Sequence, residues 1–590
     1  MTPLTKRLTL AAVATITIAA GIWAAAMQAA PSRPSTLAAD LPPGALLTIE
    51  TPNFAALLRS WNSSPEQADW LHSANYSNFA NSRLLSRLSD AQAEFAGVAA
   101  TKGGLESPFL NQVAGTESIF AWYDIANLEF LYITRLPTGR TANIELLQQH
   151  ATFSRRESGG TTFYVKTSSG TATSDDITTP STPRTIAFAT RGDFLLLATR
   201  EDLMANALAL MQQASATAPS EATEAWYAAA EAAGPARHGD LHMLLDLQRI
   251  TATPQFRTYW IQHNVTDTRQ YRAAVVDLYR DPRTFREERV LLPMNAADAP
   301  PQPDLASLEA LVPDRAGVYR ALGNPTPAAA LASLDEKLLT RSTTSAAPSL
   351  NAPAADLTIT QPGSNTDLET RIDTANTTPE PPSAATAPLL NALQSAGLTA
   401  MLTLDRTDPP DTGSLFVPIH SAVILRSATP WNTAQLQSAI LTNLSAHLTV
   451  STLGLTWTQT GNTFTLNDTT PLFLTVDGAT AILTNNQPLL TEILAHRATA
   501  PPQPAQYIAG FRHTQERANF TRLTATLAHA PSPSTPDATV ANTPGVVPDF
   551  FSGNLNSLSE AFRTFATERL VERRDGANIR QTVTYTLATP

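Results

Sequence analysis

The sequence contains no cysteine, and it contains only four lysines among its 590 residues. Without cysteine there are no disulfides, thiolate nucleophiles, iron–sulfur clusters or thiolate zinc sites. Charged residues make up only 15% of the chain, and the net charge is −11. An acidic surface repels phosphate backbones, so we expect no nucleic-acid partner. The 43% apolar content is enough for buried cores, and the length predicts more than one domain.

The amino-terminal region is apolar and carries no charge over residues 8–30, directly after Lys6 and Arg7. A helix of this length can cross a hydrocarbon core of ~30 Å, and the preceding cations orient its start toward the cytoplasm. The alternative is a cleaved signal peptide, because the small residues at 24–26 suit a signal peptidase. We predict a single-pass inner-membrane protein with its body in the periplasm, or a chain secreted to the periplasm if the signal is cleaved. Residues 1–39 are the predicted signal anchor and tether.

An internal repeat relates residues 185–209 to residues 471–495 without a gap, at an offset of 286. Eleven of the 25 columns are apolar in both copies, where about five are expected by chance. Each copy predicts two short strands that turn at a glycine, Gly192 or Gly478, followed by a helix. We expect Thr199 and Asn486 to cap the two helices.

Other segments follow the same order in both halves of the chain. Residues 41–61 and 311–334 each predict a strand and then a helix, and so do residues 130–149 and 422–441. We expect each half to close with a charged helical stretch and a strand, at 286–292 and 579–587. Residues 220–233 predict a further helix, which has acidic residues at its start and Gly234-Pro235 at its end.

The predicted fold is α+β: two homologous units, each a mainly antiparallel sheet packed with helices, behind the amino-terminal transmembrane or signal helix. The first unit covers residues 40–293, a Pro-rich linker covers 294–304, and the second unit covers 305–590. Residues 342–387 are rich in Ser, Thr, Asn and Pro and contain no aromatic residue. Such a composition cannot bury enough apolar surface to offset the entropy of ordering, so we predict a disordered insertion there.

The tetrapeptide Asp411-Thr412-Gly413-Ser414 has the form in which aspartic proteases present a catalytic carboxylate. Catalysis of that kind needs two carboxylates that share a proton, each at the end of a buried strand. Asp411 instead follows Pro409-Pro410, which is typical of a turn. No second Asp-Thr-Gly or Asp-Ser-Gly occurs in the chain. We therefore interpret Asp411 as part of a loop between strands at 398–404 and 421–427.

His238 and His242 have a spacing that would place both rings on one face of a helix, as in some zinc sites. The surrounding alternation instead predicts a strand that begins near Gly239. Positions four apart on a strand are about 13 Å apart, too far to share one ion. We therefore interpret both residues as ordinary histidines at the edge of a strand.

Two groups of arginines close the two halves: Arg280, Arg283, Arg286 and Arg289, then Arg569, Arg573, Arg574 and Arg580. They could capture an anionic partner, but neighbouring glutamates favour a solvated face of mixed charge. Glycine-rich phosphate loops, the Gly-x-Ser-x-Gly elbow and Ser-x-x-Lys are absent from the sequence. We assign no catalytic, cofactor-binding or metal-binding residue and no cofactor.

In both halves, a Pro–strand–helix order is followed by hairpins such as residues 192–203, GDFLLLATREDL, and both halves follow an exported start. This pattern resembles a family of uncharacterised bacterial envelope proteins. That family is a duplicated α+β domain of unknown function, and the resemblance implies no activity. We expect a non-enzymatic scaffold or interaction module in the cell envelope, with a protein partner there and contact with the inner membrane through residues 8–30. Two alternatives stay open: a protein that binds a lipid or other apolar ligand, and a hydrolase whose site is assembled from distant residues. The sequence does not identify a ligand.

Overall fold

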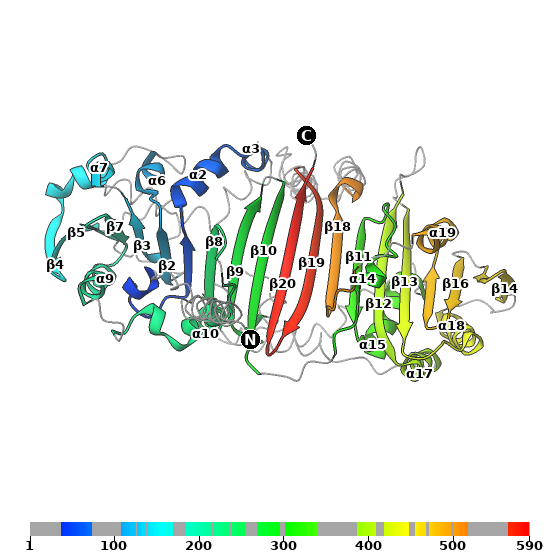
Figure 1. The fold of residues 1–590 in the computed structure, drawn as a ribbon. Helices are drawn as coiled ribbons and strands as arrows, with labels where there is room; N and C mark the ends of the chain where they lie inside the picture. Colours follow the sequence, from blue (N-terminus) through cyan, green and yellow to red (C-terminus); the bar gives the residue numbers. More distant parts are fainter. Residues whose placement is uncertain are drawn as a thin grey trace, which may run out of the picture.

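The computed structural model describes residues 37–72, 108–124, 127–136, 138–168, 184–213, 218–236, 238–253, 268–281, 283–295, 301–339, 386–408, 418–447, 455–467, 471–496, 501–516 and 564–588. Over these residues the chain forms one mainly antiparallel sheet that carries helices on both faces, so the fold class is α+β as predicted. Figure 1 shows this sheet running across the molecule.

The strands of the first half pair in an order that differs from their order along the chain. From the outer edge inward, they are β4 (Ser154–Ser158), β5 (Thr161–Ser168), β6 (Arg184–Arg191), β7 (Phe194–Ala198), β3 (Glu129–Arg135), β2 (Ser118–Asp124), β1 (Leu47–Thr51), β8 (Leu241–Asp246), β9 (Tyr271–Asp281) and β10 (Thr284–Pro293).

The strands of the second half follow the corresponding order. From the other outer edge inward, they are β14 (Trp457–Thr460), β15 (Thr463–Leu466), β16 (Leu472–Asp477), β17 (Thr480–Thr484), β13 (Ile419–Ser427), β12 (Leu398–Thr407), β11 (Val318–Gly323), β18 (Tyr507–Arg512), β19 (Phe565–Asp575) and β20 (Asn578–Leu587). The strand order is therefore the same in both halves: adding ten to the number of each first-half strand gives the strand in the equivalent position of the second half.

The two halves meet where β10 pairs with β20, from Thr284 opposite Thr586 to Leu291 opposite Ile579. An aromatic cluster adds to this junction. The ring of Phe565 lies 6.2 Å from that of Phe285 and 5.6 Å from that of Tyr585. Figure 1 shows β10, β20 and β19 in the middle of the sheet, with β4 and β14 toward opposite ends. Backbone pairing and ring contacts across the junction therefore join the halves in one sheet.

Alternating side chains of the strands build a core on each face of the sheet. In the first half Leu131 and Ile133 pack on one face, and the intervening Tyr132 packs on the other. In the second half Ala422 and Ile424 belong to a different core from Val423. Each half is therefore a helix–sheet–helix arrangement.

The helices lie on both faces of this sheet. In the first half they are η1 (Leu37–Asp40), α2 (Phe54–Asn62), α3 (Pro65–His72), α6 (Pro108–Val113), α7 (Thr138–Thr141), α8 (Glu145–Gln148), η2 (His150–Thr152), α9 (Glu201–Gln213), η3 (Glu221–Thr223), α10 (Ala225–Ala233) and α11 (Leu247–Ala252). In the second half they are α14 (Ala306–Glu309), α15 (Pro327–Leu334), η4 (Asp335–Leu339), α17 (Ala387–Ala396), α18 (Thr433–His447) and α19 (Gln487–Ala495).

The hairpin–helix segments predicted at 185–209 and 471–495 are both present, as β6–β7–α9 and β16–β17–α19. Gly192 and Gly478 have positive φ angles of 56° and 57°, which the tight turns require. The charged helical stretch expected at the end of each half is wrong. Each half instead ends in a two-stranded hairpin, β9–β10 and β19–β20. The charged residues there lie on both faces of each strand, because side chains alternate along it.

The predicted helix at 220–233 begins later than expected, because the chain first forms the short turn η3 and then α10. The Ser220 hydroxyl and the Thr223 side chain cap that turn reciprocally. The predicted insertion at 342–387 lies almost entirely outside the described residues. The segment at 8–30 lies wholly outside them. Among the helices that the structure describes, none is both long and apolar enough to cross a membrane.

Candidate functional site

The rings of His238 and His242 stack on each other, with centroids 3.8 Å apart and an interplanar angle of 4°. The prediction that these two side chains lie about 13 Å apart is therefore wrong. The physical reason is that β8 begins only at Leu241, so His238 lies before the strand and not within it. The chain turns between the two residues, and this turn stacks one imidazole ring on the other.

Gly239 makes this turn possible by letting two backbones approach closely. A Cβ atom at this position would lie 2.4 Å from the carbonyl oxygen of Leu278 on β9. The Gly239 amide donates a hydrogen bond of 2.7 Å to Asp277 Oδ1. Glycine is therefore required here by space, and the contact holds the His238 segment against β9.

Asp277 is fully buried and orients His242, its partner across β8 and β9. His242 Nδ1 lies 3.0 Å from Asp277 Oδ1 and 3.1 Å from Oδ2. With its Nδ1 held by this carboxylate, the imidazole directs Nε2 toward α10. The ring itself is only 1% exposed.

Glu231 comes from α10, which packs over β8, β9 and β10. This helix is rich in alanine, and it buries Tyr227 and Ala230 on the side that faces the sheet. Glu231 lies one residue beyond Ala230, at the rim of that buried side, and its side chain is 11% exposed. Its two carboxylate oxygens lie 3.1 Å from His238 Nε2 and 3.2 Å from His242 Nε2. The helix thus supplies one carboxylate to both imidazoles.

Glu50 extends the cluster by one strand, because it lies opposite His242 across β1 and β8. The hydroxyl of the buried Tyr227 donates a hydrogen bond of 3.3 Å to Glu50 Oε1. Glu50, His242 and Asp277 are successive cross-strand neighbours, so their side chains emerge on the same face of the sheet.

The electrostatics of the cluster follow from its burial and its hydrogen bonds. Burial lowers the pKa of His242, but hydrogen bonds to Asp277 and Glu231 outweigh burial and raise this pKa to about 9. Burial raises the pKa of Glu231, but hydrogen bonds from His238 and His242 hold it well below its usual value. Burial raises the pKa of Glu50 to about 7. In the absence of another cation, His242 is therefore an imidazolium between two carboxylates at neutral pH.

Three side chains of this cluster offer donor atoms of the kinds that bind metal ions. One donor atom each from Glu231, His238 and His242 lies within 4.8 Å of the others. The strands that take the same places in the second half, β11, β18 and β19, contain no histidine. The segment from α9 to β8 includes α10, whereas α19 and β18 are separated only by residues 496–506. Among the described residues, this cluster therefore has no counterpart in the second half.

The Asp411 stretch lies between two paired strands, as predicted. Strands β12 and β13 form an antiparallel pair that ends with Thr407 opposite Ile419. Asp411 itself lies outside the described residues, so its interpretation as a loop residue stays a prediction.

Several of the clustered arginines form ion pairs with nearby carboxylates. Arg289 Nε lies 2.7 Å from Glu287 Oε1, and Arg569 Nη2 lies 2.6 Å from Glu309 Oε2. Arg286 pairs with Glu288, and Arg580 Nε lies 2.7 Å from Asp575 Oδ2. These contacts favour the interpretation of a surface of mixed charge over capture of an anionic partner.

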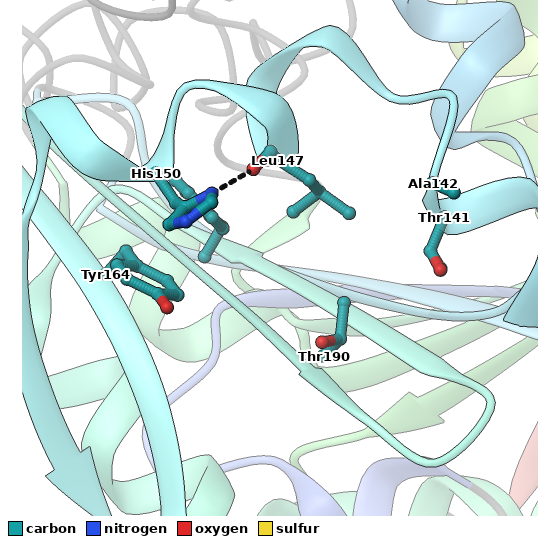
Figure 2. A pocket seen from close by; sticks show the side chains of 7 residues that line it. Thr141, Ala142, Leu147, His150, Tyr164 and Thr190 are labelled. Carbon is teal, nitrogen blue, oxygen red and sulfur yellow. Dashed lines mark hydrogen bonds between the residues drawn. The ribbon is translucent and has the colours of Figure 1, made fainter.

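A hollow of about 250 Å³ lies at the β4–β7 end of the sheet (Figure 2). It is lined by Thr141, Ala142, Leu147, His150, Tyr164, Phe188 and Thr190. His150 Nδ1 lies 2.9 Å from the carbonyl oxygen of Leu147, and the His150 ring lies 5.3 Å from that of Tyr164. Its volume is below the ~300–1,000 Å³ of most ligand pockets.

The sequence drew attention to two of the clustered residues, but Glu231 and Asp277 were missed. Glu231 is one acidic residue on a predicted helix, and Asp277 lies in a strand 35 positions beyond His242. The signal that could have been used is Gly239, since a glycine just before a strand marks a turn or a close backbone approach. Such a turn would have placed His238 outside the strand.

Comparisons with known proteins do not assign a family. No protein-family model matches the chain, and no curated protein matches it. Two solved structures match, "Structure of crystal form I of TP0453" and "Structure of crystal form III of TP0453". The first has a TM-score of 0.22 and 10% identity over 46% of this chain and 82% of that chain. The second has a TM-score of 0.20 and 11% identity over 44% and 81%. Similarity at this level supports no conclusion about fold or function, and the family resemblance stays a prediction.

Proposed function

We propose that the chain consists of two copies of one α+β unit, residues 40–293 and 305–590, which are joined by the linker at 294–304. The matching strand order of β1–β10 and β11–β20 supports this proposal. The sequence repeat at an offset of 286 is an independent second support, since it falls on the same elements, β6–β7–α9 and β16–β17–α19. Pairing of β10 with β20 relates the two units by a local two-fold arrangement, because the equivalent last strands run antiparallel.

We further propose that this body is a non-enzymatic scaffold in a bacterial cell envelope, placed outside the cytoplasm by residues 8–30. The observation that carries the proposal is the continuous pairing through the centre of the sheet. Two units on a flexible linker would move independently, whereas two units in one sheet hold their outer surfaces at a fixed spacing. A fixed spacing favours simultaneous binding at both surfaces, as scaffolding requires.

An apolar-ligand carrier receives less support from the structure. Such a protein needs an enclosed apolar cavity, and the hollow described above, in Figure 2, does not provide it, because it is small and lined partly by threonine and histidine. A hydrolase needs a nucleophile or an activated water beside a substrate cleft. We therefore propose the scaffold, and co-purified lipid in the test below would instead favour the carrier.

The test is cross-linking and affinity purification of the full-length protein from gently solubilised membranes, with its amino terminus sequenced in parallel. We expect the chain in the inner-membrane fraction and one protein partner at a fixed ratio. An intact start at residue 1 or 2 indicates the anchor, and a start near residues 25–31 indicates cleavage. Recovery in the cytosol would contradict export. Co-purified lipid without a protein partner would contradict the scaffold and favour the carrier.

A further inference from the structure

The donor atoms of Glu231, His238 and His242 have the spacing of a metal coordination shell. Nitrogen or oxygen ligands bind zinc at about 2.0–2.2 Å, so two ligands at a tetrahedral angle lie about 3.3 Å apart. The separations between Glu231 oxygens and the two Nε2 atoms are 3.1 and 3.2 Å. These separations involve the two different oxygens of Glu231, and the imidazoles stack 4° from parallel. A metal ion can therefore bind once at least one ring rotates, so that both Nε2 atoms are directed at the same point.

The position of these ligands is fixed by groups that do not themselves face the ion. Asp277 accepts from His242 Nδ1 and from the Gly239 amide, so it orients one imidazole and anchors the turn that carries the other. A carboxylate behind a histidine ligand is the usual second shell of a metal site, because it sets the tautomer and makes Nε2 a better donor. This arrangement is a second observation, separate from the convergence of the three donors.

The ligand types select the class of ion. Two imidazole nitrogens and one carboxylate oxygen suit zinc and its first-row neighbours, whereas calcium and magnesium prefer oxygen ligands alone. Three protein donors leave a coordination position for water. Of the two imidazoles, His238 is the more accessible, with 25% of its side chain exposed against 1% for His242, so a water ligand would enter from the side of His238.

We propose that Glu231, His238 and His242 form a binding site for one zinc-class divalent ion, which joins α10 to the start of β8. Binding attaches α10 to the sheet of the first half, whereas among the described residues of the second half no helix lies between α19 and β18. The site stabilises this half and leaves one coordination position open to solvent. The corresponding strands of the second half, β11, β18 and β19, carry no histidine, so we expect no equivalent site at that place.

A metal-free interpretation makes a different prediction. An imidazolium at His242 satisfies both neighbouring carboxylates through hydrogen bonds alone. In that case the cluster is an ion-pair network that holds α10 in place, and divalent ions have no specific affinity for it.

The test uses full-length untagged protein that has been stripped with a chelator and titrated with Co²⁺, whose visible absorption reports tetrahedral coordination. We expect one equivalent to bind and Zn²⁺ to displace it. His238→Ala and Glu231→Gln should each weaken Co²⁺ binding by roughly 100-fold or more, and Asp277→Asn by about 10–100-fold. His150→Ala, which removes a histidine from the hollow in Figure 2, is the matched control and should bind as the wild type does.

Thermal unfolding provides a second readout for variants that fold. Saturating Zn²⁺ should raise the Tm of the wild type and of His150→Ala, but not that of His238→Ala. His238 is partly exposed, so its removal leaves the core intact and keeps the comparison valid even if another variant misfolds. Absence of saturable Co²⁺ binding, or binding that is unchanged in both His238→Ala and Glu231→Gln, would overturn the proposal.

Discussion

At the scale of single residues, buried acidic side chains have consequences that can be measured. Glu221 is fully buried, and its Oε2 accepts a hydrogen bond of 2.9 Å from the Ala45 amide. Burial raises the pKa of Glu221 to about 7, against the opposing backbone hydrogen bonds of Ala45 and Gly44, while Glu224 adds to the increase and Arg249 reduces it. The folded protein therefore keeps a proton on Glu221 that the unfolded chain releases near pH 4.5.

This difference makes the unfolding free energy depend on pH in a stated direction. Between pH 4.5 and 7 the unfolded state has lost the proton and the folded state still holds it, so stability falls as the pH rises. The full penalty, roughly 3 kcal/mol for a shift of this size, is present above pH 7. Glu221→Gln removes the titration, so urea unfolding at pH 4.5 and 7.5 should show a smaller decrease in the variant. Parallel pH profiles would contradict the assignment.

The geometry of the candidate site could not be predicted from the sequence. His238 and His242 were recognised as a pair, but their separation was judged from the strand spacing alone. The correct geometry depends on Gly239, whose missing Cβ allows the close approach to Leu278. Glu231 and Asp277 join the pair only through the packing of α10 on β8 and β9. No local pattern encodes that packing.

At the scale of elements, local rules predicted the hairpin–helix segments β6–β7–α9 and β16–β17–α19, and helix caps are the clearest test of such rules. Asn486 caps α19 as predicted, since its Oδ1 accepts a hydrogen bond of 2.8 Å from the Leu489 amide. The corresponding prediction for Thr199 is wrong. Its hydroxyl oxygen accepts a hydrogen bond of 2.8 Å from the Phe130 amide, and α9 begins at Glu201. The Thr199 hydroxyl, which would have capped the helix, is instead used in a tertiary hydrogen bond between segments 69 positions apart.

The cap at Asn486 predicts a specific loss of stability. Asn486→Ala removes the acceptor for the Leu489 amide and also a 3.3 Å contact from Arg406 Nη2. We expect the unfolding free energy of the protein to fall by about 1–2 kcal/mol in urea denaturation. Gln487→Ala, one position along and exposed, is the control and should stay within about 0.5 kcal/mol of the wild type. Equal losses in the two variants would show that the cap contributes nothing.

At the scale of the whole molecule, the sequence predicted the order of elements but not the order of strands. Most pairs join consecutive strands, but β1 also pairs with β8, and β3 also pairs with β7, which lie far apart along the chain. Hydrophobic periodicity identifies a strand and its buried face, but it does not name the partner. The pairing of β10 with β20 joins segments almost 300 residues apart. It is the feature on which the proposed fixed spacing of the two units depends.

The absence of cysteine makes a direct test of this junction possible. Thr284 and Thr586 are opposite each other on β10 and β20. Their Cα atoms should therefore lie about 4.5–5.5 Å apart, within the range that a disulfide spans. Thr582 is four positions away from Thr586 on the same strand, about 13 Å further along, and is the matched control.

The most direct measurement is therefore mild oxidation of the full-length double variant Thr284→Cys/Thr586→Cys, followed by non-reducing electrophoresis. The account predicts an intramolecular disulfide in monomeric protein at high yield, and little or none in Thr284→Cys/Thr582→Cys. A cross-link that forms only between two chains, or equally in both double variants, would contradict the single sheet.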